Sequence, residues 1–187
     1  MPHADAEPSP WLLRWAHLIA PGGAVLDLAC GFGRHARLLA ARAHPVVALD
    51  RDREALAALA GTPGIEALQA DLEDGSPWPL GERRFAAVVV FNYLHRPLFP
   101  RIAAALGEGG VLVYETFAAG NERYGRPSNP HFLLQPAELL DAFSPLLSVV
   151  AFEQGGVSRP KPAVIQRLCA IRGGVADAGL ENPAAQR

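Results

Sequence analysis

The sequence predicts a doubly wound α/β fold, in which helices cover both faces of a mainly parallel sheet. Short apolar runs of strand length alternate with amphipathic runs of helix length as far as Phe117. The apolar runs are nearly continuous, as in strands that are buried on both faces. A length of 187 residues and a hydrophobic content of 50% fit one domain with a single core.

The expected elements follow one another in a regular order. The first is an amphipathic helix over residues 10–20, with Trp11, Leu12 and Trp15 at helical spacing. We then expect strands at 24–29, 45–50, 65–70, 85–91 and 110–117, and intervening helices at 34–42, 52–60 and 97–106. Alternation of this kind predicts parallel strands joined by right-handed crossovers.

The pattern changes after residue 118. Residues 118–135 predict a long loop and residues 136–143 a short helix. Two final strands, 146–153 and 163–172, can pair as a hairpin at the sheet edge. We expect residues 1–9 and 174–187 to be disordered tails of a single domain that covers residues 1–187.

Composition bears on the class of partner. The formal net charge of −2 gives no global attraction to nucleic acid or to an anionic membrane. No apolar stretch approaches the roughly 20 residues that span a bilayer, and the N-terminus lacks the apolar region of a signal peptide. We therefore expect a cytoplasmic protein without a membrane partner. Neither Cys30 and Cys169 nor the six histidines have metal-ligand spacing, so no metal site is predicted.

The most informative segment joins the first strand of the sheet to its helix. Asp27 comes near the end of the strand, and Ala29, Gly31 and Gly33 follow at alternate positions. The glycines allow backbone N–H groups to approach a ligand at a helix N-terminus. A carboxylate before such a loop repels a pyrophosphate and attracts an ammonium group. Because alanine favours negative φ, we expect the loop to begin at Ala29 in an ordinary conformation.

Two further acids stand at the ends of the next two strands. Asp50 is followed by Arg51, and Asp71 is followed by Leu72. Because the carboxyl ends of parallel strands meet at one edge of a sheet, we expect Asp27, Asp50 and Asp71 to lie along that edge. In dinucleotide-binding folds, an acid at the tip of the second strand accepts hydrogen bonds from ribose hydroxyls.

This pattern resembles the nucleotide-binding motif of class I S-adenosylmethionine (SAM) methyltransferases, Asp/Glu-x-Gly-x-Gly-x-Gly, with alanine in place of the first glycine. The resemblance implies a Rossmann-like, seven-stranded, three-layer α/β/α fold with an antiparallel last strand, and SAM as cofactor. It assigns the methionine amino group to the first acid, the ribose to the second and the adenine to the third. The implied cofactor-binding set is Asp27, Ala29, Gly31, Gly33, Asp50, Arg51, Asp71, Leu72 and Asn92.

Methyltransferases of this family place catalytic groups at the tip of the fourth strand, which here reads Asn92-Tyr93-Leu94-His95. The resemblance makes His95 and Tyr93 the catalytic candidates. An unperturbed histidine titrates near neutral pH and can accept a proton; a structural histidine that bonds the loop backbone is the alternative. The Leu94-His95 pair resembles small-molecule members of the family. The segment departs from the Asn/Asp-Pro-Pro-Tyr/Phe tetrapeptide of amino-directed nucleic-acid enzymes, which argues against methylation of adenine or glutamine nitrogen.

The long loop that follows the fifth strand is the second candidate for function. Loops of this length at the ligand-binding edge are often lids or binding loops. Glu115, Tyr124, Arg126 and Asn129 are therefore candidate substrate-binding residues, and a compact loop packed by its own side chains is the alternative. The stretch 129–134 resembles small bacterial methyltransferases of the tellurite-resistance type.

The leading hypothesis is a SAM-dependent methyltransferase that acts on a small molecule. The second is an NAD(P)-dependent oxidoreductase that uses Gly31, Gly33 and Asp50, which the acids at the first and third strand tips disfavour. The third is a non-catalytic module that binds SAM or a partner protein. RNA stays open as an acceptor because of scattered arginines, although no added RNA-binding domain is visible; these arginines are Arg83, Arg84, Arg96, Arg123 and Arg126.

Overall fold

The computed structural model describes residues 7–174 and 179–180. The first part of the chain contains α1 (Pro10–Trp15), β1 (Val25–Leu28), α2 (Arg34–Ala41), β2 (Val46–Asp50), α3 (Arg53–Ala57), β3 (Ile65–Gln69), β4 (Phe85–Phe91), α4 (Phe99–Ala104) and β5 (Leu106–Phe117). The second part contains two 3-10 turns, η3 (Asn121–Tyr124) and η4 (Pro130–Phe132), followed by α5 (Glu138–Phe143), β6 (Ser148–Val157) and β7 (Ala163–Ile171).

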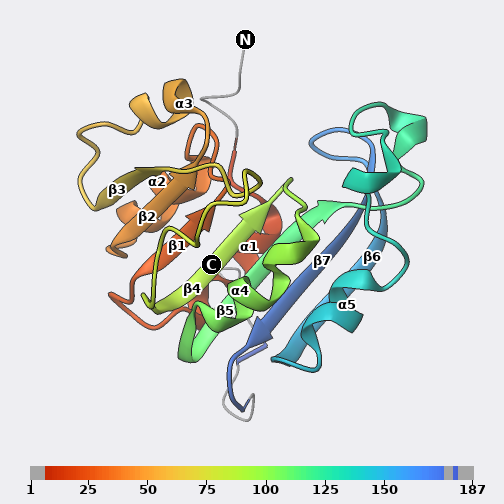
Figure 1. The fold of residues 1–187 in the computed structure, drawn as a ribbon. Coiled ribbons are helices and arrows are strands. Elements are labelled where there is room, and N and C mark those ends of the chain that lie inside the picture. Colours follow the sequence, from red (N-terminus) through yellow and green to blue (C-terminus); the bar gives the residue numbers. More distant parts are fainter. Residues whose placement is uncertain (1–6, 175–178, 181–187) are drawn as a thin grey trace.

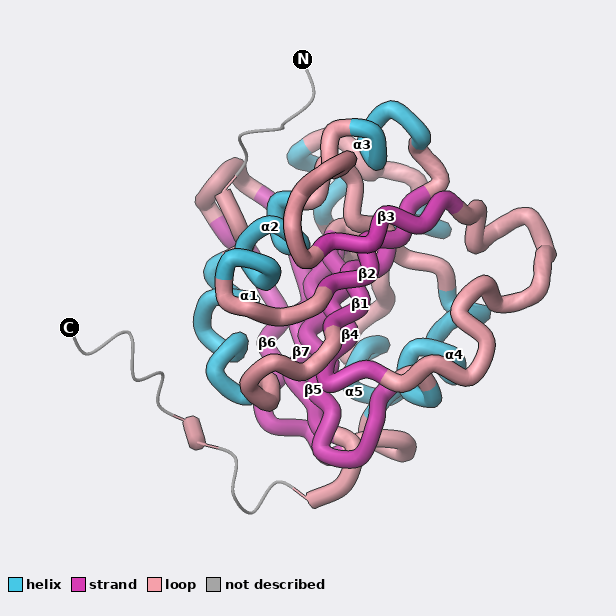
Figure 2. The backbone as a smooth tube through the Cα atoms, turned by 90° about the vertical axis from the view of Figure 1, so that its left-hand side faces the viewer, coloured by secondary structure: helices cyan, strands magenta, loops and turns pink. Residues whose placement is uncertain are grey.

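The strands form one seven-stranded sheet in the order β3-β2-β1-β4-β5-β7-β6 (Figure 1). Strands β1 to β5 pair in parallel, and β7 runs antiparallel to both β5 and β6. Viewed along the sheet, α1 and α2 lie on one side and α4 and α5 on the other (Figure 2). The predicted fold class, a seven-stranded three-layer sheet with an antiparallel last strand, is confirmed.

The structure refines the expected hairpin at the sheet edge. Strands β6 and β7 do pair, but β7 lies inside the sheet and β6 forms its edge. The sequence explains this order, because β7 is buried at almost every position whereas β6 is only half-buried. Strand β7 is apolar except at Gln166 and Arg167, which is typical of a strand that is buried on both faces.

Several helices are shorter than the periodicity predicts. The expected helix 10–20 ends as an α-helix at Trp15 and tightens into a 3-10 turn over Ala16–Leu18. The expected helix 97–106 is divided between a 3-10 turn over Arg96–Leu98 and α4. Strand β5 begins at Leu106 rather than 110, with a register shift against β4 at the glycine-containing segment 107–110. Local hydrogen bonding at element ends, rather than apolar spacing, decides these bounds.

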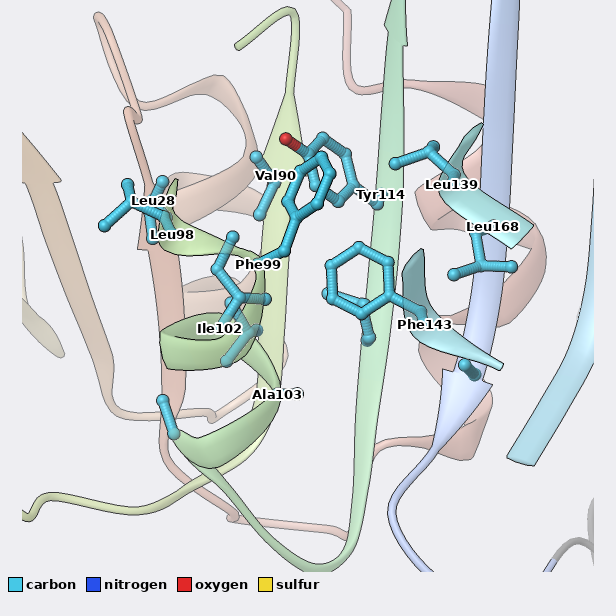
Figure 3. Packing of buried hydrophobic residues seen from close by; sticks show 14 of the residues in the cluster. Leu28, Val90, Leu98, Phe99, Ile102, Ala103, Tyr114, Leu139, Phe143 and Leu168 are labelled. Atoms are coloured by element: carbon cyan, nitrogen blue, oxygen red, sulfur yellow. The ribbon is translucent and has the colours of Figure 1, made fainter. Parts of the chain in front are cut away.

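Each face of the sheet has its own apolar cluster. Trp11 and Leu39, from α1 and α2, belong to the cluster on one face. On the other face, the rings of Phe99, Tyr114 and Phe143 meet between β5 and helices α4 and α5 (Figure 3), with centroids 5.2 to 6.2 Å apart. Burying one such side chain contributes roughly 1.5–3 kcal/mol. The two clusters therefore fix the strands whose carboxyl ends carry the candidate site.

Ser9 belongs to the folded structure and not to the expected tail of residues 1–9. It is buried, and its hydroxyl accepts a hydrogen bond from the Trp11 N–H at the start of α1. Its N–H donates to His35 Nε2 at 3.1 Å and its hydroxyl donates to Glu115 Oε1 at 3.0 Å. Residues 1–6, 175–178 and 181–187 of the two expected tails lie outside the described residues.

Candidate cofactor and acceptor site

The three acids at the strand tips lie on neighbouring strands. Asp27, Asp50 and Asp71 stand at or just beyond the carboxyl ends of β1, β2 and β3, which pair in parallel. A pocket of about 420 Å³ extends along this edge from the tip of β2 to the loop after β5. The predicted cofactor residues that line it are Ala29, Asp50, Arg51, Asp71, Leu72 and Asn92.

Asp27 lies beneath the glycine loop and does not line this pocket. It is 1% exposed, and the backbone N–H of Ala36 donates to its carboxylate. Its other oxygen, Oδ2, is buried without a hydrogen-bond partner. Burial raises the pKa of Asp27 to about 7, against the opposing charge of Arg34. An unpaired buried carboxylate oxygen is costly unless a ligand or water satisfies it.

The glycine loop is tied to the tip of β2. The Gly31 N–H donates to Asp50 Oδ2 at 2.7 Å, and the Asp52 N–H donates to Asp50 Oδ1 at 2.9 Å. Gly33 has a φ of +74°, and a Cβ at that position would lie 2.4 Å from Leu59 Cδ2. The tight loop therefore requires glycine at position 33, for its backbone conformation and for its packing.

The expectation of an ordinary conformation at Ala29 is wrong. Ala29 has a φ of +56° and Asn92 a φ of +57°, both in the left-handed region. The chain takes this turn because the Cys30 N–H, just beyond Ala29, donates to the Leu49 carbonyl at 3.0 Å. The conformation costs an alanine roughly 1–2 kcal/mol. Both strained residues line the pocket at the tips of adjacent strands β1 and β4, and such strain often marks functional sites.

Tyr93, one of the two catalytic candidates, lines the pocket. Burial raises its pKa above the usual range, and the neighbouring Glu73 carboxylate, to which its hydroxyl is hydrogen-bonded, raises it further. Tyr93 therefore keeps its proton at neutral pH, where it can donate a hydrogen bond but cannot act as a base.

The structure places His95, the other catalytic candidate, at a different pocket. This second pocket has a volume of about 460 Å³, and Trp78 and Arg101 also line it. Residues 71–73 line both pockets, so the two pockets adjoin each other at this segment. Tyr93 and His95 are thus separated although they are two residues apart in the chain.

The loop after β5 reaches the pocket through residues other than those predicted. Tyr124, Arg126 and Asn129 are exposed and do not line it. Asn129 instead caps the η4 turn by accepting a hydrogen bond from the His131 N–H at 3.0 Å. Pro127 and Phe132 of the same loop do line the pocket.

Glu115 lies in a cluster of charged and polar groups outside the pocket. It accepts a hydrogen bond from Ser9 and pairs with Arg167 at 3.6 Å. Burial raises its pKa, while Ser9, Arg167 and Arg34 act in the opposite direction. The structure thus links Glu115 to the N-terminal segment and does not bring it to the pocket with Pro127 and Phe132.

Sequence reasoning missed several pocket-lining residues, among them Glu73 and Thr116. Glu73 lies two positions beyond the predicted adenine acid, and Thr116 follows Glu115 in β5, so alternation along the strand was the available signal. Among the described residues, no group of three or more His, Cys, Asp or Glu side chains is arranged to hold a metal ion. None of the described helices has the length and apolar character needed to cross a membrane.

Comparison with known families gives the class of protein that this chain resembles. Residues 25–110, from β1 into β5, match the model of a family described as a methyltransferase domain. The match confirms the predicted resemblance to methyltransferases and the predicted enzyme class. No curated protein matches the chain in sequence.

Solved structures give particular relatives. TehB from Haemophilus influenzae aligns with a TM-score of 0.68 and 17% identity over 84% of this chain, which spans 60% of the TehB chain. A TehB-like SAM-dependent methyltransferase from Corynebacterium glutamicum gives a TM-score of 0.63, with 21% identity, over 87% of this chain and 88% of that one. The glycopeptide N-methyltransferase MtfA, complexed with S-adenosylhomocysteine, gives a TM-score of 0.63 with 19% identity, over 90% of this chain and 91% of the MtfA chain. At these identities the likeness concerns the fold.

Proposed function

We propose that this protein transfers a methyl group from SAM to a small-molecule acceptor bound at the tips of β4 and β5. The observation that carries the proposal is the row of acids on three neighbouring strands beside one pocket. That pocket continues from the β2 tip to residues of the loop after β5. The proposal includes the cytoplasmic location predicted from the sequence.

The residues present fit SAM on two independent observations. Asp27 offers a buried carboxylate oxygen without a partner, which suits the positively charged amino group of the methionine part, directly or through a water. Gly31 has no heavy atom within 4 Å of the place where a Cβ would stand, which leaves room for a ligand against the loop backbone. Asp50 and Asp71, in the pocket wall, would hold the ribose and the adenine.

When bound, SAM supplies a methyl group on a positively charged sulfur for in-line displacement by the acceptor. The protein has to position the acceptor and exclude water. Tyr93, Phe117 and Phe132 provide aromatic surface on the acceptor side of the pocket. Tyr93 retains its proton and is suited to orient the acceptor by a hydrogen bond.

His95 is a weaker catalytic candidate than Tyr93 in this proposal, because it lines the neighbouring pocket with Trp78. An acceptor that reacts as a thiolate, or as another ionised nucleophile, needs no base in the displacement step. The enzyme as proposed therefore relies on positioning, with His95 kept as a candidate for proton removal only if the acceptor extends past the segment 71–73.

A methyl-transfer screen tests the proposal. The protein is incubated with SAM carrying a labelled methyl group and with fractions of a metabolite pool or with RNA. We expect label in a small-molecule fraction, and label in RNA alone would identify the other acceptor class. The cofactor is tested separately by calorimetry with S-adenosylhomocysteine, which at about 100 times its Kd should stabilise the fold by roughly 2.7 kcal/mol. Binding of NAD(P)H in its place would overturn the proposal in favour of an oxidoreductase.

A further inference from the structure

Arg96 connects the loop at the β4 tip with the loop that follows β5. Its guanidinium donates to both carboxylate oxygens of Glu138 at the start of α5. The same group donates to the His131 carbonyl at 2.8 Å and to the Leu133 carbonyl at 2.9 Å. One side chain thus binds acceptor groups that lie 35 to 42 residues further along the chain.

Glu138 is itself held in place from the other side. The Gln135 N–H donates to Glu138 Oε2 at 2.7 Å. Burial opposes ionisation of Glu138, but the hydrogen bonds from Arg96 and the Gln135 N–H outweigh burial, and the pKa of Glu138 is lowered. The pair is therefore ionised at neutral pH, which gives a bidentate, charge-assisted contact of the stronger kind.

The two carbonyl groups that Arg96 binds flank Phe132, which lines the pocket. The Phe132 side chain is 50% exposed, so packing alone holds it weakly. The neighbouring Leu133 is buried and anchors the C-terminal side of the turn. The position of the aromatic ring over the pocket consequently depends on the backbone that Arg96 holds.

Pro127, the other residue of this loop that lines the pocket, is also held by a hydrogen bond from a side chain to its backbone. The Asn121 side chain donates to the Pro127 carbonyl at 3.0 Å and accepts a hydrogen bond from the Val164 N–H in β7 at 3.1 Å. Bonds from side chains to backbone therefore set both parts of this wall. Of the two side chains that make these bonds, Arg96 comes from the β4 tip, next to the pocket-lining residues Tyr93 and Leu94.

We propose that Arg96 is a positioning residue that holds Phe132 as the acceptor-side wall of the pocket, in register with Tyr93. This inference rests on the proposed function, because the acceptor side is defined by it. Four hydrogen bonds to three acceptor groups require the planar, forked guanidinium. A lysine ammonium keeps the charge but cannot reach the same set of acceptors.

The test places 4-fluorophenylalanine at position 132 and records its fluorine NMR signal in the otherwise unchanged full chain and in Arg96→Lys. Arg83→Lys is the matched control, because Arg83 makes a comparable two-bond contact with Glu66 away from the pocket. We expect one defined resonance in the parent and in Arg83→Lys, and a signal shifted toward that of the free amino acid in Arg96→Lys. Circular dichroism checks that each variant is folded.

S-adenosylhomocysteine is then added to each protein. The parent resonance should shift because Phe132 lines the pocket. Calorimetry should show a Kd changed by less than about threefold in Arg96→Lys, since Arg96 does not line the pocket and bonds none of the strand-tip acids. An Arg96→Lys resonance that coincides with the parent, with and without the compound, would overturn the inference. If S-adenosylhomocysteine does not bind the parent, the proposed function fails, while the comparison of resonances without the compound still decides the role of Arg96.

Discussion

The tips of β1, β2 and β3 hold their polar groups with backbone bonds, whereas the loop after the β5 tip is held by distant side chains. On the first side, the backbone N–H groups of Gly31 and Asp52, which lie 19 and 2 residues from Asp50 in sequence, fix its carboxylate. On the other side, the half-exposed Phe132 depends on Arg96. We call the tips of β1 to β3 the proposed cofactor half and the β4 tip with the loop after β5 the proposed acceptor half. A rigid cofactor half suits a cofactor that is always the same. An acceptor half whose shape can change separately suits acceptors that differ. Substitutions in each half test this division.

The largest effect is expected from Asp27→Asn, which removes the buried charge beneath the cofactor half. A hydrogen bond to a charged group contributes roughly 1.5–3 kcal/mol, so S-adenosylhomocysteine affinity should fall by about 10- to 100-fold in calorimetry. An exposed turn acid, Asp74, provides the control Asp74→Asn. Equal affinity in Asp27→Asn and the parent would remove Asp27 from the site.

The same substitution should stabilise the protein without ligand at high pH. The folded-state pKa of Asp27 is raised from 3.8 to about 7, so its ionisation favours unfolding as the pH rises through that range. At about 1.36 kcal/mol per pKa unit, the cost above pH 7 approaches roughly 4 kcal/mol. Urea denaturation should therefore show a gain for Asp27→Asn at pH 8 that is absent at pH 4. A stability difference independent of pH would contradict the assignment.

Asp50→Ala should have the next largest effect. It removes the carboxylate proposed to hold the ribose and also frees the Gly31 N–H. We expect a loss of S-adenosylhomocysteine affinity of about tenfold or more, from one or two hydrogen bonds to a charged acceptor. The neighbouring Asp52→Ala is the control: Asp52 caps α3, so that variant should lose about 1 kcal/mol of stability and no affinity.

The pH dependence of binding separates the two acids. Below pH 7 the Asp27 carboxyl becomes protonated and loses its attraction for an ammonium group. Affinity for S-adenosylhomocysteine should therefore fall by about tenfold between pH 8 and pH 6 in the parent, following the ionised fraction. Calorimetry on Asp27→Asn should give a much flatter profile. A profile unchanged by that substitution would assign the titration to another group.

The smallest effect is expected from His95→Ala. Because His95 lines the second pocket and not the one that holds Asp50, S-adenosylhomocysteine affinity should stay within about twofold of the parent. Turnover of the acceptor found by the screen should fall by less than about tenfold. A decrease in kcat of about 10²–10⁴ would instead identify His95 as a general base.

The positions of the acids in the proposed cofactor half were largely predictable because the sequence signals are local. Strand runs that end in Asp27, Asp50 and Asp71 place these acids on one edge as soon as the strands are parallel. The φ of Ala29 was not predictable from residue type, because the bond between Cys30 and Leu49 joins the loop after β1 to strand β2. A backbone conformation imposed by tertiary pairing overrides the preference of the residue.

The residues that line the pocket in the proposed acceptor half were less predictable, because the contacts that position them join residues far apart in sequence. Polar and aromatic composition indicated a functional loop but favoured its exposed residues, Tyr124, Arg126 and Asn129. The pocket instead receives Pro127 and Phe132, whose positions depend on Asn121 and Arg96. For Ser9, the sequence Ser9-Pro10 was a usable signal, since serine before proline is typical of a helix start.

The ends of the loop after β5 are closed by their own backbone. The Leu134 N–H donates to the Phe117 carbonyl at 3.0 Å, and the Ala119 N–H donates to the Leu134 carbonyl at 2.9 Å. These two bonds fix both ends of the segment between Ala119 and Leu134 beside the end of β5. Lengthening a closed loop costs little conformational entropy, about 0.6 kcal/mol for each doubling. We therefore expect that loop grafting can replace the enclosed segment, and with it the proposed acceptor-side wall, while the sheet and the strand-tip acids stay in place.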